Sequence, residues 1–250
     1  MSGVISKAIR VLDMLLPHGE EKELSVTEIS KRLEMPVQSV HRILSSLREH
    51  GFVARNSQTR KYKLGLSLMK YGSLMRDSLL FRSVAQPYMQ ELSRATKETV
   101  YLASRENDEG VYVDAIDSPQ FLKISEPIGL RLPLVIGASN RVILAFLPAK
   151  TQEELLRKVD WRNVPSLKPL TREYVLADLE TIRKQGFATT TGEATEGTTG
   201  IAAPIFSYER QVIGSLNVAG PAIRFQRETM ERNVVLAKKF AELISREMGY

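Results

Sequence analysis

The chain of 250 residues is long enough for two domains, and its 43% hydrophobic and 26% charged residues are typical of a soluble protein. It contains no cysteine, which excludes disulfides, thiolate nucleophiles and sulfur-based zinc sites. No segment approaches the ~18 uninterrupted apolar residues that a membrane span needs, and the first residues lead into a charged helix instead of a signal peptide. We therefore expect a cytoplasmic protein that does not contact membranes.

The positive charge is concentrated in one short stretch. The whole chain carries a net charge of +6, and residues 36–63 hold six basic side chains against one acidic side chain. A solvated surface usually mixes both signs, so a block this one-sided indicates a polyanionic partner.

Three short helices are predicted in the first 50 residues. Apolar side chains at helical spacing over residues 5–16 indicate the first, and Pro17 with Gly19 ends it. A capping box formed by Ser25 and Glu28 begins the second. After a tight turn, the third helix runs over residues 36–50, with a proline at its first position.

The third helix has one apolar arc and one polar arc. At about 100° per residue, the apolar arc carries Val37, Val40, Ile43, Leu44 and Leu47. In a helix-turn-helix the last helix lies in the DNA major groove, where Gln pairs with adenine and Arg with guanine. We therefore predict base contacts from Gln38, Ser39, His41, Arg42 and Ser45.

A basic hairpin follows the third helix. Gly51 ends that helix, and residues 52–55 and 61–64 form two predicted strands around a polar turn. Such a wing holds phosphates without reading sequence, and the cations placed for this are Arg48, Arg55, Arg60 and Lys61. The alternative for this quarter of the chain is a small protein-interaction module, but the capping box, tight turn, polar arc and basic wing together favour DNA.

The remainder of the chain predicts a linker helix and an α+β domain. A narrow apolar stripe over residues 65–81 indicates a helix that pairs with its copy in a second subunit or packs on its own chain. Antiparallel strands with helices gathered around them follow. Strands are predicted near residues 99–105, 111–117, 187–192, 201–206 and 211–219, and helices over 83–96, 138–147, 151–158, 172–185 and 227–248.

Most catalytic chemistry is excluded from this larger part. All three histidines, His18, His41 and His50, lie in the first 50 residues, so Ser-His or Cys-His catalysis and a His-rich metal site are unavailable beyond them. There is no phosphate-binding loop. We expect no enzyme, metal or cofactor; the alternative is a cofactor-free enzyme using Glu193 and Glu196 as an acid/base pair. A sensor pocket needs only an apolar cavity with a few polar groups.

The whole chain resembles the IclR-type transcriptional regulators. The similarity rests on segments that occur in the family's order and at its spacing, including Ser6–Leu12, Pro36–Leu47, Lys61–Gly65, Leu132–Leu134, Leu144–Pro148, Gly200–Phe206 and Ile213–Pro221.

This resemblance implies a winged helix-turn-helix over residues 4–65, a linker helix over 66–82 and a GAF-like effector-binding domain over 83–250. It further implies a repressor that binds a palindromic operator as a homodimer or homotetramer and responds to a small metabolite, commonly a carboxylate. Carried over by position, the effector-binding residues are Leu132, Ala138, Ser139, Glu193, Pro204, Asn217 and Ala219.

Several positions depart from the family pattern. The family usually has Gly-Lys in place of Asn140-Arg141, His in place of Val135 and Ser in place of Asn217. These changes predict an altered pocket mouth. Glu34 stands at a turn position often held by Gly, and we expect it to strain or reshape that turn.

Overall fold

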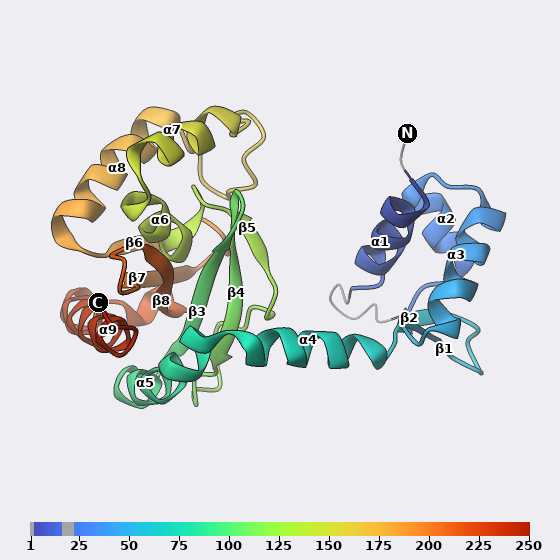
Figure 1. Ribbon diagram of the computed structural model, residues 1–250, viewed down its shortest axis with the longest axis horizontal. Coiled ribbons are helices and arrows are strands. Elements are labelled where there is room, and N and C mark those ends of the chain that lie inside the picture. The colour runs from blue at the N-terminus through green and yellow to red at the C-terminus, as the bar shows by residue number, and fades with distance from the viewer. Residues whose placement is uncertain (1–2, 17–22) are drawn as a thin grey trace. The chain divides into compact units, whose positions relative to one another are not determined.

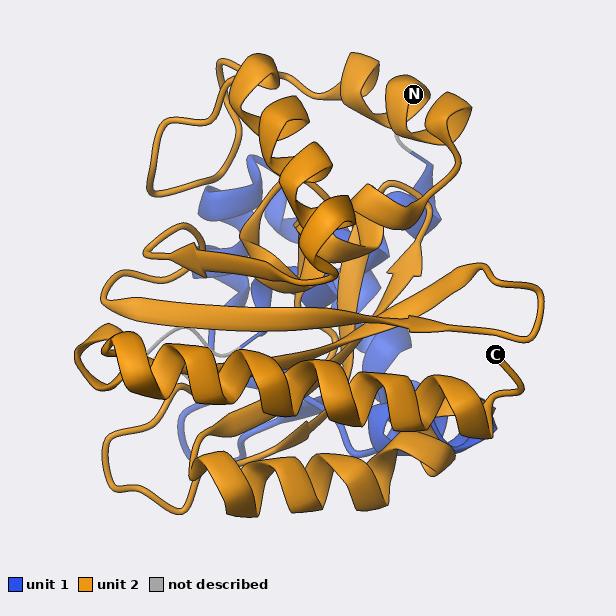
Figure 2. Ribbon diagram, turned by 90° about the vertical axis from the view of Figure 1, so that its left-hand side faces the viewer, with its two compact units in different colours: residues 1–78 blue, residues 79–250 orange. Residues whose placement is uncertain are grey.

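The computed structural model describes residues 3–16 and 23–250, and the chain divides into two compact units between Ser78 and Leu79 (Figure 2). No helix within these residues is long and apolar enough to cross a bilayer.

The first unit confirms the winged helix-turn-helix. Its elements are α1 (Val4–Met14), α2 (Val26–Leu33), α3 (Val37–Glu49), β1 (Val53–Arg55), β2 (Tyr62–Leu64) and α4 (Ser67–Ser78) (Figure 1). The first three helices and the hairpin share one core that includes Val11, Ile29, Leu44 and Tyr62. The predicted stop signal of the first helix, Pro17 and Gly19, lies outside the described residues.

The local signals of the first unit act as predicted, with two corrections. Ser25 accepts from the backbone N–H of Glu28, whose carboxylate accepts in return from Ser25 N–H at 2.6 Å. Pro36 has an extended ψ of 136° and is the residue before α3, not its first residue. Val37, which the apolar arc placed in the core, is instead 50% exposed, because it lies in the first turn of α3, beyond the edge of the core.

The turn between α2 and α3 is left-handed at Glu34. Its φ of 54° and ψ of 42° fall in the region that favours glycine, as the departure from the family pattern predicted. The Ser30 hydroxyl donates to the Met35 carbonyl at 2.5 Å, and the Met35 side chain is buried in the core. These contacts hold the turn without a glycine.

The linker helix is shorter than predicted. α4 ends at Ser78, and α5 (Leu80–Thr96) begins before the predicted residue 83. The reason is burial, because Phe81 and Arg82 are both enclosed in the second unit and Arg82 forms an ion pair with Asp114 at 2.7 Å. No residue of α4 is buried.

The second unit is an antiparallel sheet between two helical layers, which confirms the α+β class. The strand order is β5-β4-β3-β8-β7-β6. The strands are β3 (Thr99–Glu106), β4 (Glu109–Ile116), β5 (Arg131–Pro133), β6 (Ala188–Thr191), β7 (Thr198–Phe206) and β8 (Val212–Pro221). Its helices after α5 are α6 (Gly137–Phe146), α7 (Ala149–Lys158), α8 (Arg172–Gln185), the 3-10 turn Ala222–Arg224 and α9 (Arg227–Glu247).

Side-chain alternation assigns each face of the sheet to one helical layer. Ile201 and Ala203 pack with α5 and α9, whereas Ala202 between them packs with α6, α7 and α8. Figure 1 shows these helices on opposite sides of the sheet. Along each strand, a residue next to one that packs on α9 therefore points to the opposite face of the sheet, toward α6.

Candidate nucleic-acid interface and effector pocket

The polar arc of α3 faces solvent. Gln38, His41 and Arg42 are exposed, and Ser39 and Ser45 are half-buried. Val40, Ile43 and Leu44 on the opposite side are buried in the core of the first unit. All five predicted base-contact residues thus lie on the surface of one helix, with the longest side chains the most exposed.

The wing cations differ in how far the fold already neutralises them. Arg48, Arg55 and Arg60 are exposed. Lys61 is half-buried, and its ammonium lies 3.3 Å from the Glu28 carboxylate; Lys63 lies 3.8 Å from Glu23. The arginines therefore present more uncompensated charge to a polyanion than the lysines do.

Two acidic partners of the wing were not predicted from the sequence. Glu28 belongs to the capping box, and hydrogen bonds from the backbone and side chain of Ser25, with a smaller contribution from Lys61, lower its pKa to about 2. Glu23 accepts from the Asn56 amide at 3.0 Å and from the Thr59 hydroxyl at 2.9 Å, and these bonds lower its pKa. Both carboxylates brace the hairpin against α2.

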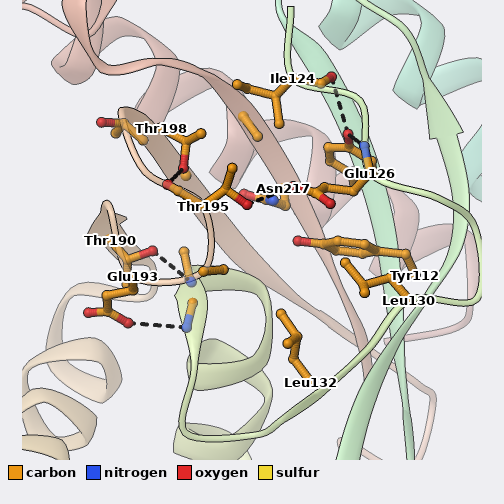
Figure 3. Close-up of a pocket in the computed structure, with 17 residues that line it drawn as sticks. Tyr112, Ile124, Glu126, Leu130, Leu132, Thr190, Glu193, Thr195, Thr198 and Asn217 are labelled. Atoms are coloured by element: carbon orange, nitrogen blue, oxygen red, sulfur yellow. Dashed lines mark hydrogen bonds between the residues drawn. The ribbon is translucent and has the colours of Figure 1, made fainter. Parts of the chain in front are cut away.

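A narrow cavity opens between the α6 face of the sheet and two loops (Figure 3). About 480 Å³ of empty space lies between its walls, a volume that includes open solvent at its mouth. Its walls combine aromatic and aliphatic side chains with hydroxyl, amide and carboxylate groups. The larger lining side chains are Tyr101, Tyr112, Ile124, Glu126, Leu130, Leu132, Thr190, Glu193, Thr195, Thr198 and Asn217.

Five of the seven predicted effector residues line this cavity, namely Leu132, Ala138, Glu193, Asn217 and Ala219. Ser139 lies behind the wall, buried, with its hydroxyl 3.4 Å from that of Tyr112. Pro204 is not a lining residue. Strand β7 contributes Gly200 instead, and Pro204 lies four residues farther along, roughly 13 Å away at ~3.3 Å per residue.

Arg141 and Glu193 form a buried ion pair at the start of α6. Glu193 accepts from Arg141 at 2.5 Å and from the Gly137 backbone N–H at 3.2 Å. Arg141 is fully buried, donates to the Val135 carbonyl at 3.0 Å and pairs with Asp178 at 2.8 Å. Although burial alone would lower the pKa of Arg141, the two carboxylates raise it. Arginine in place of the family's lysine thus bridges two acids and a carbonyl.

Two stacked tyrosines form the aromatic wall. The rings of Tyr101 and Tyr112 lie 4.5 Å apart. The Tyr101 hydroxyl donates to the Ile124 carbonyl at 3.2 Å and accepts from the Glu126 backbone N–H at 2.7 Å, which fixes the loop over the cavity. Burial raises the pKa of both phenols, so both are neutral hydrogen-bond donors at physiological pH.

Sequence reasoning missed these tyrosines and Glu126. Strand alternation alone could have placed Tyr101 on the face shared with Asn217, its cross-strand partner in β8. Glu126 lies in an irregular segment between β4 and β5, where no periodicity indicates a direction. The Gly- and Thr-rich residues 189–200 are different, because their composition indicates a loop between two strands, and Glu193, Ala194 and Thr195 from this segment line the cavity.

The geometry favours neither an acid/base pair formed by Glu193 and Glu196 nor a carboxylate as the effector. Glu196 is exposed, whereas Glu193 is buried against Arg141, so the two carboxylates do not converge as an acid/base pair. The cavity lining contains Glu126 and Glu193 but no Lys, Arg or His among the described residues. This charge disfavours the carboxylate effector that the family resemblance implies.

Comparison with known proteins agrees with this architecture. Residues 4–57 match the IclR helix-turn-helix domain, and residues 75–246 match the family described as bacterial transcriptional regulator IclR C-terminal. The HTH-type transcriptional regulator KdgR of Escherichia coli is 32% identical over 98% of this chain and 94% of its own length.

Solved structures show the same fold. The crystal structure of Thermotoga maritima IclR is 30% identical, covers 98% of both chains and superposes with a TM-score of 0.78. An IclR homolog of Microbacterium hydrocarbonoxydans, solved with 4-hydroxybenzoate, is 24% identical with a TM-score of 0.78 and covers 98% of this chain and 99% of its own. The matches to both units, together spanning almost the whole sequence, show that the chain belongs to the IclR family of bacterial transcriptional regulators.

Proposed function

We propose that this protein is a ligand-responsive repressor that binds a palindromic DNA operator. The observation that carries the proposal is the exposed polar arc of α3, which presents Gln38, His41 and Arg42 on a helix whose other face is core. Because operator DNA is chromosomal, the proposal places the protein in the cytoplasm.

The contacts divide by chemistry. The α3 residues Gln38, Ser39, His41, Arg42 and Ser45 reach base edges, since amide, imidazole, guanidinium and hydroxyl groups match the donor and acceptor pattern of the major groove. The phosphates are held by Arg48, Arg55, Arg60 and Lys61, which supply affinity without sequence information. Lys61 contributes least of these because Glu28 already shares its charge.

A palindromic operator requires at least a dimer, and α4 supports one. Met69, Tyr71, Leu74 and Met75 on this helix are each between 55% and 67% exposed. Tyr71 stacks on Phe52 of the same chain, with ring centroids 5.5 Å apart, but no residue of α4 is buried. An amphipathic helix left this exposed gains stability when a second copy covers its apolar side chains. Two half-sites one helical turn apart then match two copies of α3, and two such dimers form the tetramer.

The cavity in the second unit is the effector site of this proposal. Leu132, Ala138, Glu193, Asn217 and Ala219 line it, and its enclosed, mixed apolar and polar wall is the kind that binds small molecules. The bound ligand shifts an equilibrium between two arrangements of the dimer that differ in the separation of the α3 helices. Reciprocity requires operator DNA to change ligand affinity by the same factor.

A mobility-shift experiment tests the DNA-binding part. The protein should retain a fragment of its own upstream region in excess random DNA at physiological salt. Arg42→Ala should cost ~1–3 kcal/mol and relax selectivity at one base pair. Arg157→Ala is the matched control. Arg157 is also an exposed arginine, but it lies in the second unit, where it pairs with Glu153. Equal binding to random DNA, or equal effects of the two substitutions, would exclude the proposal and favour a protein-interaction module.

A further inference from the structure

The effector cavity carries an unbalanced negative charge. Of its two carboxylates, Glu193 is paired with Arg141, which in turn also neutralises part of Asp178. Glu126 is different, because no ion pair among the described residues includes it. The cavity therefore holds one carboxylate whose charge is compensated and one whose charge is left for a ligand.

The Glu126 carboxylate is held in place toward the cavity. Its backbone N–H donates to the Tyr101 hydroxyl at 2.7 Å, and one carboxylate oxygen accepts from the Thr195 hydroxyl at 2.7 Å. Figure 3 shows the side chain of Glu126 reaching into the space beside Asn217 and facing Tyr112. Two loops, one from each side of the opening, thus aim this carboxylate inward.

A buried acceptor without a donor lies beside it. Asn217 is 3% exposed, and its side-chain oxygen Oδ1 has no hydrogen-bond partner among the described residues. Gly200 on the neighbouring strand leaves room for this amide, since a Cβ there would lie 3.3 Å from Oδ1. A buried acceptor without a donor is costly, and a ligand N–H at this position would satisfy it.

We propose that the effector of this site is a small organic cation, whose ammonium or guanidinium group pairs with Glu126 and donates to Asn217. The inference rests on the proposed function in taking this cavity as the effector site. Stacked Tyr101 and Tyr112 line the cavity beside the cationic group and contact the ligand's apolar body. A ligand whose only charge is a carboxylate meets Glu126 with like charge instead.

Matched ligands of opposite charge test the inference directly. Benzylamine, benzyl alcohol and phenylacetate form one series, and butylamine, butanol and pentanoate form another, so that each series keeps its hydrocarbon part and varies only the polar group. Ligand-detected NMR titrations on the full-length protein at neutral pH give the affinities. In at least one series, we expect the amine to bind at least about tenfold tighter than the carboxylate, because an opposite charge at ~4–6 Å changes such equilibria by tenfold or more.

Two substitutions locate the preference. Glu126→Gln keeps an oxygen that accepts from Thr195 but removes the charge, and it should reduce the amine preference about tenfold. Glu196→Gln removes the same charge from an exposed residue of the adjoining loop that does not line the cavity, and it should leave the preference unchanged. A cooperative thermal unfolding transition of each variant, measured without ligand, verifies that both variants fold.

The outcomes separate this inference from the proposed function. Equal or tighter binding of the carboxylates, no binding of either amine up to about 10 mM, or an unchanged preference in Glu126→Gln would overturn the cationic ligand. If a carboxylate binds and weakens operator binding, the inference fails while the regulatory function stands. If an amine binds through Glu126 but leaves operator affinity unchanged, the ligand class stands and the coupling to DNA fails.

Discussion

Removing the charge of Arg141 should destabilise the second unit strongly. The guanidinium is fully buried, and Arg141→Met would leave the Glu193 carboxylate, 5% exposed, without its cation. Losing one member of a buried ion pair costs about 3–5 kcal/mol. In a unit of this size each kcal/mol lowers the melting temperature by about 2–4 °C, so the variant should melt about 10 °C lower.

Tryptophan fluorescence measures this effect in the unit concerned. Trp161 is the only tryptophan of the chain, and it packs against the core cluster that contains α6. Its signal therefore follows the second unit and is not mixed with unfolding of the first. Arg157→Met, which breaks an exposed pair with Glu153, should cost ~0–1 kcal/mol.

The double variant Arg141→Met with Glu193→Gln provides the decisive comparison. The neutral amide can still accept from the Gly137 N–H, and the carboxylate still deprived of Arg141 is that of Asp178, which is 24% exposed to water. The double variant should therefore recover most of the lost stability. If Arg141→Met melted no earlier than Arg157→Met, or if the two changes simply added, the reasoning about an uncompensated buried charge would be refuted.

Four other substitutions test the first unit, including α4. Ser25→Ala should lower the free energy of unfolding by ~1 kcal/mol and return the pKa of Glu28 from about 2 toward 4.5, which carboxyl NMR would show. Because the folded-state pKa is lowered, the Glu28 carboxylate stabilises the wild-type fold above pH 4.5, and this stabilisation is lost as the pH falls toward 2. An acid titration of the two proteins would reveal the difference. Arg60→Ala should reduce the slope of log affinity against log salt by about 1, and Lys61→Ala by less, because Glu28 already pairs with Lys61; equal slopes would contradict the charge assignment. Leu74→Lys should shift sedimentation from dimer to monomer, whereas an unchanged sedimentation coefficient would show that α4 does not form the dimer contact.

The elements that the sequence predicted well have their signals close in the chain. For α8, the Thr171 hydroxyl accepts from the Tyr174 N–H at 3.1 Å and Gly186 adopts a φ of 77°, so the predicted and observed ends coincide. The start of α2 was likewise predicted, because its capping box needs only Ser25 and Glu28. Caps and stops act within a turn or two, and for that reason they are readable without the fold.

Features that depend on distant partners were missed. Strand β5 has three residues and exists because Arg131–Pro133 pair with residues of β4 that lie 20 to 24 positions earlier in the chain. The early start of α5 follows from the burial of Phe81 and the ion pair of Arg82 with Asp114. No local pattern encodes these contacts.

The effector site shows the same division. The family pattern placed Leu132, Glu193 and Asn217 at the cavity because those positions lie next to recognisable motifs. It did not indicate Glu126, which lies in an irregular loop and is held at the cavity by the hydrogen bond that its backbone N–H donates to the Tyr101 hydroxyl. The charge of the site therefore emerged only from the arrangement of side chains in space.

Selection of bound sequences from a pool of random duplex DNA tests sequence-specific operator recognition most directly. The protein, incubated at physiological salt, should enrich an inverted repeat whose half-sites are about one helical turn apart. Its affinity for that repeat should exceed the affinity for unselected DNA by ~10³ or more. Arg42→Ala should lose the preference at one position in each half-site. A pool that remains random after selection would contradict the assignment of α3 as a DNA-reading helix.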